Sequence, residues 1–127
     1  MKDATKVLII DDDPTHLQIY GWIVGAAGYE ALPALVTGNR IDFPDRAADI
    51  VLLDYRLTGQ MTAMDAVAQV RGRHPEAPII VLSDLYDLPA DVAPQVQAFV
   101  RKGEPARLVQ TLAGFERAEP AQPESAA

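Results

Sequence analysis

Three runs of four apolar residues divide the chain, and a side chain that carries oxygen directly follows each run. The runs are Val7–Ile10, Ile50–Leu53 and Ile79–Leu82, and the residues that follow them are Asp11, Asp54 and Ser83. Short continuous aliphatic runs predict strands that are buried on both faces, as in a parallel sheet. Parallel sheets place ligand sites outside the carboxyl ends of their strands. We therefore expect these two carboxylates and this hydroxyl to meet in one crevice.

Helices are expected between the strands. Asp13 is a candidate N-cap, Pro14 suits the first position of a helix, and Gly28 suits the position just past its end. A second helix is expected over about Ala63–Arg73, where apolar residues recur at helical spacing. Pro105 opens a final helix. Each of these three segments follows a predicted strand, as in a βαβ unit.

Other segments carry weaker signals. Tyr29–Leu35 is expected to be the second strand, and Pro33 favours an edge position for it. Thr37–Ala48 contains a glycine and a proline, so its helix is expected to be short or irregular. Tyr86–Val96 is expected to form a poor helix because two prolines interrupt it. Gln97–Val100 is the expected fifth strand.

The alternation of strands and helices predicts an α/β fold. Right-handed crossovers give a doubly wound, five-stranded parallel sheet in the flavodoxin-like order 2-1-3-4-5, with helices on both faces. Residues 1–115 are expected to form one domain. Residues 116–127 are polar with two prolines, and we expect them to be a disordered tail.

Composition narrows the function. Of the 127 residues 49% are hydrophobic, which is enough for a core, and the net charge of −7 argues against a nucleic-acid or anionic-membrane binder. The sequence contains no cysteine, which excludes disulfides and thiolate metal sites. It shows neither a signal-peptide layout nor an apolar run of about 18 residues, so a cytoplasmic location is expected.

The residues at the strand ends suit phosphoryl chemistry. The carboxylates that follow the first and second of the apolar runs provide the oxygen ligands that Mg²⁺ prefers. Lys102, near the end of the fifth strand, adds a second cation, and Ser83 adds a hydroxyl donor. Metal, lysine and hydroxyl together match the charge and the oxygen atoms of a phosphoryl group. A carboxylate among them is a candidate phosphoryl acceptor, through an acyl phosphate.

Four segments carry a resemblance to a known family. They read VLIIDDDPTHL, ADIVLLDYRLTG, APIIVLSD and AFVRKGEP. In this order and at this spacing they resemble the response-regulator receiver domains of two-component signalling. The resemblance covers residues 5–115 and implies the 2-1-3-4-5 sheet.

The resemblance also implies roles for individual residues. Asp54 would be the phosphoryl acceptor. Its metal would be Mg²⁺, bound directly by Asp12, Asp54 and the backbone carbonyl of Arg56, and through water by Asp11. Lys102 would pair with the phosphoryl group or with Asp54, and Ser83 would be the conserved hydroxyl. Ser83 and Phe99 would be the switch residues.

Several positions depart from the family pattern. Gly103 stands where proline is usual, so the cis peptide of the family is not expected there, because a non-proline cis bond costs about 3 kcal/mol. Thr58 and Ala63 replace a common proline and glycine, and Asp84 replaces a small apolar residue. These substitutions leave the phosphorylation interpretation intact, but they concern the geometry of the conformational switch that the family uses. Phosphoryl lifetime in this family depends on the positions that Arg56 and Leu85 occupy here.

The leading interpretation is a signalling module that is not an enzyme, beyond autocatalytic phosphoryl acceptance and slow autodephosphorylation. Its partners would be a sensor histidine kinase or a histidine phosphotransfer protein, and a downstream protein target. The chain would be stand-alone or part of a larger protein, and a homodimer is compatible with the sequence.

Two alternatives remain open at this point. One is a phosphorylation-independent docking module with the same fold. The other is an Mg²⁺-dependent phosphohydrolase with Asp54 as nucleophile, although its usual general acid is missing if Asp13 caps a helix. His16 and His74 are expected to be surface residues without a metal role, because no second histidine stands at ligand spacing.

Overall fold

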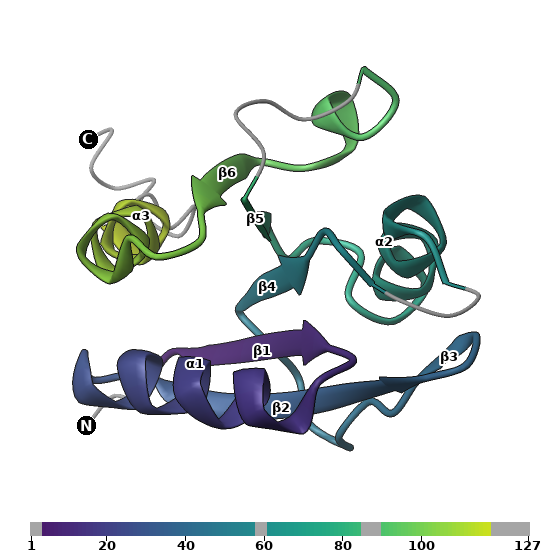
Figure 1. Cartoon of the computed structure of the whole chain (residues 1–127). Helices are drawn as coiled ribbons and strands as arrows, with labels where there is room; N and C mark the ends of the chain where they lie inside the picture. Colours follow the sequence, from purple (N-terminus) through teal and green to yellow (C-terminus); the bar gives the residue numbers. More distant parts are fainter. Residues whose placement is uncertain (1–3, 58–60, 85–89, 118–127) are drawn as a thin grey trace, which may run out of the picture.

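The structure is a computed structural model, and it describes residues 4–57, 61–84 and 90–117. Its strands are β1 (Lys6–Asp11), β2 (Glu30–Thr37), β3 (Arg40–Ile41), β4 (Ile50–Asp54), β5 (Ile79–Ser83) and β6 (Ala98–Arg101). Its helices are α1 (Pro14–Ala26), α2 (Ala63–Arg73), α3 (Pro105–Arg117) and the short 3₁₀ helix η1 (Ala93–Gln95). Strands and helices alternate along most of the chain, as the sequence predicts (Figure 1).

The strands form one twisted sheet in the order β3-β2-β1-β4-β5-β6. All neighbours pair in parallel except β2 and β3, which pair antiparallel. Without β3, this is the predicted 2-1-3-4-5 order. The prediction of five strands was wrong by this one added edge strand.

The hairpin that creates β3 replaces the irregular helix predicted for Thr37–Ala48. Thr37 pairs with Arg40, so Gly38 and Asn39 form a two-residue turn. Gly38 has a φ of 64° whereas Asn39 has a negative φ, the pattern of a type II′ turn with glycine first. Ile41 is buried, and this burial fixes the register of the hairpin.

Pro33 occupies a position where the sheet tolerates a missing N–H. Strand β2 lies second from the edge, but β3 pairs only with Val36 and Thr37. Pro33 pairs with Ile9 of β1 on the inner side and lies beyond the reach of this short hairpin. The edge character predicted from Pro33 is therefore a local property of β2.

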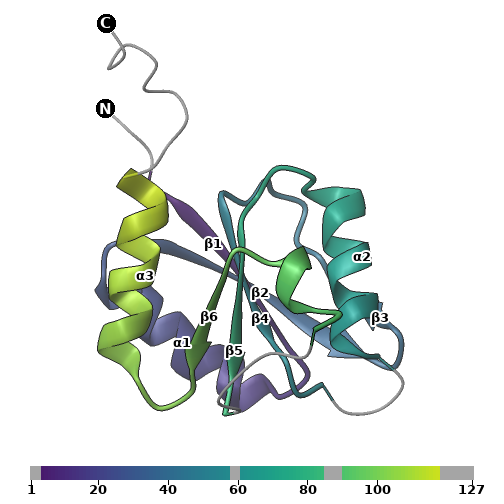
Figure 2. The ribbon, with the colours of Figure 1, turned by 90° about the horizontal axis from the view of Figure 1, so that it is seen from above.

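The sheet separates two apolar cores. Alternate residues of β1, β4 and β5 point to opposite faces, as in any pleated strand. One core joins strand residues to α2 through Ala66, Val67 and Val70, and the other joins the sheet to α1 and α3 through Leu17, Val24, Leu108 and Leu112. Figure 2 shows α1 and α3 on one side of the sheet and α2 on the other. Because both faces are covered, the strands are continuously apolar, which is the pattern that predicted them.

The helix ends follow the predicted signals. The Asp13 side chain accepts a hydrogen bond from Thr15 N at 2.9 Å and caps α1, with Pro14 in the first turn. Gly28 has a φ of 98° just past the end of α1. Thr62 and Asp65 form a capping box at the start of α2. Helix α2 spans the predicted residues, and Pro105 opens α3.

The segment predicted as a poor helix, Tyr86–Val96, lies only partly within the described residues. Residues 85–89 lie outside the described residues, and so do Thr58 and the tail from residue 118. Within residues 90–96 the structure has the three residues of η1, which begins beside Pro94. Helix α3 ends at Arg117, two residues past the expected limit of the domain. Glu116 in its last turn accepts hydrogen bonds from Thr5 Oγ1 at 3.2 Å and Tyr29 OH at 3.1 Å.

Candidate functional site

Three strands deliver polar side chains to one edge of the sheet. Asp11, Asp54 and Ser83 are the last residues of β1, β4 and β5, and their exposed fractions are 1%, 3% and 1%. Polar groups so deeply buried need compensating partners. These three residues form the floor of the candidate site, as the sequence predicts from the strand ends.

Lys102 supplies a positive charge to this floor. Its Nζ lies 2.7 Å from Asp54 Oδ1, and the same oxygen accepts a hydrogen bond from Arg56 N at 3.2 Å. The backbone N of Lys102 donates to the carbonyl of Ser83 at 2.8 Å, which fixes the turn after β6 against the end of β5. Gly103 follows with a φ of 85°, a conformation that favours glycine. Its peptide bond is trans, in agreement with the expectation for a non-proline residue.

The carboxyl group of Asp11 has a strongly raised pKa. Burial and the nearby charge of Asp54 raise the pKa of the Asp11 carboxyl from 3.8 to about 7. A hydrogen bond from Asp13 N to Asp11 Oδ1, at 3.0 Å, opposes this shift. The raised pKa shows that the protein provides too little positive charge to stabilise the ionised form of Asp11. A bound cation would favour that ionised form.

The site environment also shifts the pKa values of two neighbours. Burial alone would lower the pKa of Lys102, but its hydrogen bond to Asp54 and the charges of Asp54 and Asp11 raise that pKa above the usual value. Lys102 is therefore a permanent cation near neutral pH. Burial raises the pKa of the Tyr20 hydroxyl, so this phenol stays protonated.

A pocket of about 360 Å³ opens next to Asp54. It is lined by Asp12, Asp13, Pro14, His16, Asp54, Arg56 and Lys102. Asp12 is partly buried here, at the start of the turn into α1. The pocket thus brings together the predicted acceptor, the predicted lysine and the predicted ligands Asp12 and Arg56.

His16 is a site residue that sequence reasoning missed. Its Nδ1 lies 3.4 Å from Asp11 Oδ2 and its Nε2 lies 3.7 Å from Asp13 Oδ2. Among the described residues, Asp11, His16 and Asp54 form a group whose potential ligand atoms all lie within 4.8 Å of one another. The available signal was position, because His16 lies in the first turn of a helix that begins at the predicted site.

Asp84 does not place its charge freely in the pocket. Its Oδ1 lies 3.5 Å from Arg56 Nη2, and both side chains are largely exposed. The cation two residues after the acceptor therefore pairs with the carboxylate that follows Ser83. This ion pair joins the loops after β4 and β5 and offsets the negative charge of Asp84 near the pocket.

The other positions singled out by the sequence have distinct surroundings. Phe99 in β6 pairs with Val81 of β5 and is partly exposed. Within the described part of the chain it belongs to neither apolar core, whereas Val100 beside it is buried in the core under α1 and α3. Ala63 is buried at the start of α2.

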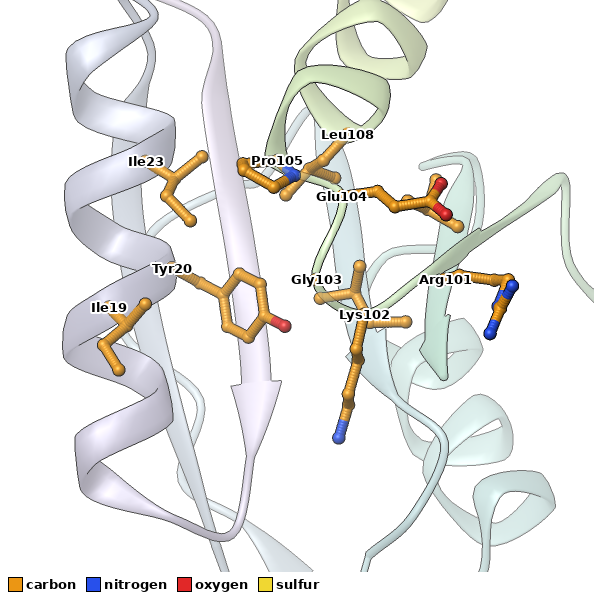
Figure 3. Close-up of a pocket in the computed structure, with 11 residues that line it drawn as sticks. Ile19, Tyr20, Ile23, Arg101, Lys102, Gly103, Glu104, Pro105 and Leu108 are labelled. Carbon is orange, nitrogen blue, oxygen red and sulfur yellow. The ribbon is translucent and has the colours of Figure 1, made fainter. Parts of the chain in front are cut away.

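A second pocket adjoins the site on the side of α1. It has a volume of about 140 Å³ and lies between α1 and the turn from β6 into α3 (Figure 3). Tyr20, Ile23 and Leu108 line it, and Lys102 lines both this pocket and the larger one. The Tyr20 ring and the Lys102 side chain extend toward the same space (Figure 3). Ile19 also lines this pocket and is 41% exposed, and Trp22, three residues further along α1, is 65% exposed.

Comparison with solved structures identifies the fold. The chain superposes on chemotaxis protein CheY4 of Vibrio cholerae with a TM-score of 0.73, at 21% identity over 89% of this chain and 99% of that one. It has the fold of a response-regulator receiver domain. The response regulator TrrA of Thermotoga maritima, solved in complex with Mg²⁺-BeF, matches with a TM-score of 0.72, at 19% identity over 87% of this chain and 98% of that one.

Receiver domains from other contexts match equally well. The signal receiver domain of a signal transduction histidine kinase from Syntrophus aciditrophicus has a TM-score of 0.71, at 20% identity over 92% of this chain and 93% of that one. No protein-family model matches the sequence, and no curated protein matches it significantly. The receiver-like architecture is thus retained at low sequence identity.

None of the described helices is long and apolar enough to span a membrane.

Proposed function

We propose that this protein is a phosphorelay receiver that accepts a phosphoryl group from a phosphohistidine onto Asp54. The observation that carries the proposal is the 2.7 Å contact between Lys102 Nζ and Asp54 Oδ1, in a pocket that also contains Asp12. A nearly inaccessible carboxylate held by a lysine at the end of a central strand is suited to be a nucleophile that needs charge compensation.

The proposed reaction balances without a further reactant. An oxygen of the Asp54 carboxylate attacks phosphorus, the P–N bond of the donor breaks, and its electron pair returns to the imidazole ring, which carries a proton on its other nitrogen and so leaves as neutral imidazole. Lys102 moves from the carboxylate toward the phosphoryl oxygens, because the acyl phosphate carries more negative charge than the carboxylate did. The Ser83 hydroxyl, at the end of the next strand, provides a hydrogen-bond donor for the same oxygens. We propose no reactions beyond this transfer and the slow hydrolysis of its product.

The donor set fits Mg²⁺. Carboxylates from Asp11, Asp12 and Asp54 are oxygen ligands, and the raised pKa of Asp11 indicates that they lack a sufficient counter-charge. Asp12, Asp54 and the carbonyl of Arg56 would hold the ion, with Asp11 acting through water. When bound, Mg²⁺ would offset negative charge on the phosphoryl oxygens. The TrrA structure, which was solved with Mg²⁺-BeF, supports this choice of ion.

The donor is proposed to be a protein that docks on α1. A phosphohistidine can reach Asp54 only if its carrier covers the mouth of the site. Lys102 lines both the smaller pocket and the larger pocket that opens at Asp54. The exposed Ile19 and Trp22 extend the apolar surface along α1. A sensor histidine kinase or histidine phosphotransfer protein would provide such a carrier. The phosphorylated form would then bind a downstream protein.

The structure favours this function over the phosphohydrolase alternative. A phosphohydrolase needs a general acid close to the nucleophile, and Asp13 is the carboxylate placed for that role. The Asp13 side chain instead caps α1 through Thr15 N and lies 3.7 Å from His16. A group fixed as a helix cap is poorly placed to deliver a proton to a leaving group.

Phosphoramidate, a small donor with a P–N bond, tests the proposal. Incubation with Mg²⁺ should give an acyl phosphate that ³¹P NMR detects on the protein, and chelation by EDTA should suppress it. Hydroxylamine should then release the phosphoryl group, because it cleaves acyl phosphates. Absence of the signal with Mg²⁺ present would favour the phosphorylation-independent docking module.

A further inference from the structure

Asp11, His16 and Asp54 form a compact group of nitrogen and oxygen donors. One potential ligand atom from each residue lies within 4.8 Å of the other two. Ligand atoms around a Zn²⁺-like ion, with bonds of about 2.1 Å, lie about 3 to 4.2 Å apart. Separations of up to 4.8 Å would have to close by roughly 0.6 to 1.8 Å to reach these distances. Their spacing allows them to converge on one metal ion after a small movement of the side chains.

The His16 ring is aimed at this group but is not satisfied by it. His16 lies in the first turn of α1, and its Nδ1 lies 3.4 Å from Asp11 Oδ2. This Nδ1 is inaccessible to solvent and has no hydrogen-bond partner among the described residues. A buried polar atom without a hydrogen-bond partner destabilises the fold. A cation between the ring and the two carboxylates would remove that destabilisation.

The outer part of the ring remains reachable. The His16 side chain is 44% exposed, and it lines the same 360 Å³ pocket as Asp54. An ion can therefore enter from solvent without opening the core. Asp11 and Asp54, which are almost fully buried, provide the negative charge at the inner end of this path.

We propose that Asp11, His16 and Asp54 bind a divalent transition metal of the class that imidazole favours, such as Zn²⁺, Co²⁺ or Ni²⁺. His16 Nδ1 would be the nitrogen ligand, and each aspartate would contribute a carboxylate oxygen. Imidazole suits these ions, whereas Mg²⁺ prefers oxygen ligands alone. This ion and the Mg²⁺ of the proposed function share Asp54 and compete for it. The inference does not depend on whether Asp54 accepts a phosphoryl group.

The two histidines of the chain provide a matched pair of variants. His74 ends α2, far along the sequence from the site, and serves as the control. Calorimetric titration with Zn²⁺ and separately with Mg²⁺ should be performed on wild type, His16→Ala and His74→Ala. We expect His16→Ala to lose about tenfold or more of its Zn²⁺ affinity. Its Mg²⁺ affinity should change much less, and His74→Ala should resemble wild type.

A second measurement needs no variant in the site. Co²⁺ added to the ¹⁵N-labelled wild-type chain should shift or broaden the imidazole resonances of His16 before those of His74. Unchanged His16 resonances at saturating Co²⁺, or full Zn²⁺ affinity in His16→Ala, would overturn the inference. Neither result would affect phosphoryl transfer with Mg²⁺, so failure of this inference is distinguishable from failure of the proposed function.

Discussion

Lys102 Nζ lies 2.7 Å from Asp54 Oδ1, although the strands that precede these residues are not neighbours in the sheet. Strand β5 lies between β4 and β6, so the lysine reaches across the end of β5 to the carboxylate. The hydrogen bond from Lys102 N to the Ser83 carbonyl fixes the backbone of Lys102 against the end of β5. Asp54, Ser83 and Lys102 are thus positioned by the carboxyl ends of three adjacent strands, β4, β5 and β6.

Removal of the lysine should slow phosphoryl acceptance. In Lys102→Ala the developing charge on the phosphoryl oxygens loses a fixed cation, and we expect the rate with acetyl phosphate and Mg²⁺ to fall by about tenfold or more. Lys6→Ala, at the opposite end of β1, removes the same charge and serves as the control. Intact-mass time courses give both rates. Equal rates in wild type and Lys102→Ala would remove Lys102 from the mechanism.

Metal-free stability should depend on pH through Asp11. Its pKa is raised from 3.8 to about 7 in the folded chain, chiefly by burial and by the charge of Asp54. At pH values between 3.8 and about 7, Asp11 is protonated more often in the folded state than in the unfolded state. The free energy of unfolding therefore falls as pH rises through this range. The loss is complete above about pH 7. It amounts to at most about 4 kcal/mol, because a pKa difference of one between the folded and unfolded states corresponds to about 1.4 kcal/mol.

The measurement is urea unfolding in EDTA at intervals from pH 4 to pH 8. Asp11→Asn cannot ionise, so the difference in stability between it and wild type should widen in favour of the variant as pH rises. Asp91→Asn, at an exposed position, should follow wild type. Excess Mg²⁺ should narrow the difference at pH 8. A constant difference across this range would show that Asp11 titrates normally.

The Arg56–Asp84 pair should control access to the acceptor. Because both side chains are exposed, their contact at 3.5 Å should contribute less than about 1 kcal/mol to stability. Arg56→Ala should nevertheless slow phosphorylation several-fold, because it leaves the charge of Asp84 unopposed near the pocket. The double variant Arg56→Ala/Asp84→Ala should recover most of the rate. If the double variant is as slow as Arg56→Ala, repulsion by Asp84 is not the cause.

Any conformational response should run through Ser83 and Phe99. Phe99 is partly exposed and, among the described residues, outside both cores, so a change in its packing leaves those two cores intact. Beryllofluoride with Mg²⁺ should shift amide resonances in residues 90–108 as well as those around Asp11 and Asp54. Ser83→Ala should confine the shifts to the site. Shifts confined to the site in wild type itself would show binding without switching.

The sequence predicted most of the sheet because its strands are buried on both faces. Every residue of the three apolar runs is buried, so these runs show the continuous pattern of strands that are covered on both faces. The runs are Val7–Ile10, Ile50–Leu53 and Ile79–Leu82. The hairpin at Gly38 was missed because β3 has only two residues, and so short a strand leaves no periodicity to detect. Its signal was the dipeptide Gly38-Asn39, which favours a two-residue turn.

The site was predictable where residues lie at strand ends and unpredictable where they depend on side-chain direction. Asp11, Asp54 and Ser83 follow directly from the topology. His16 was assigned to the surface, because no pattern of spacing shows that its ring turns toward Asp11. The Arg56–Asp84 pair was missed for the same reason, since it joins two loops that only the folded sheet brings together.

The most direct test of the account is the intact mass of the protein after incubation with acetyl phosphate and Mg²⁺. Wild type and Asp91→Asn should each gain the mass of one phosphoryl group, and Asp54→Asn should gain none. Because an asparagine keeps the shape of the aspartate, the loss would report the missing carboxylate and not a disrupted fold. An equal mass gain in Asp54→Asn would place the phosphoryl group elsewhere and would contradict the assignment of Asp54 as the acceptor.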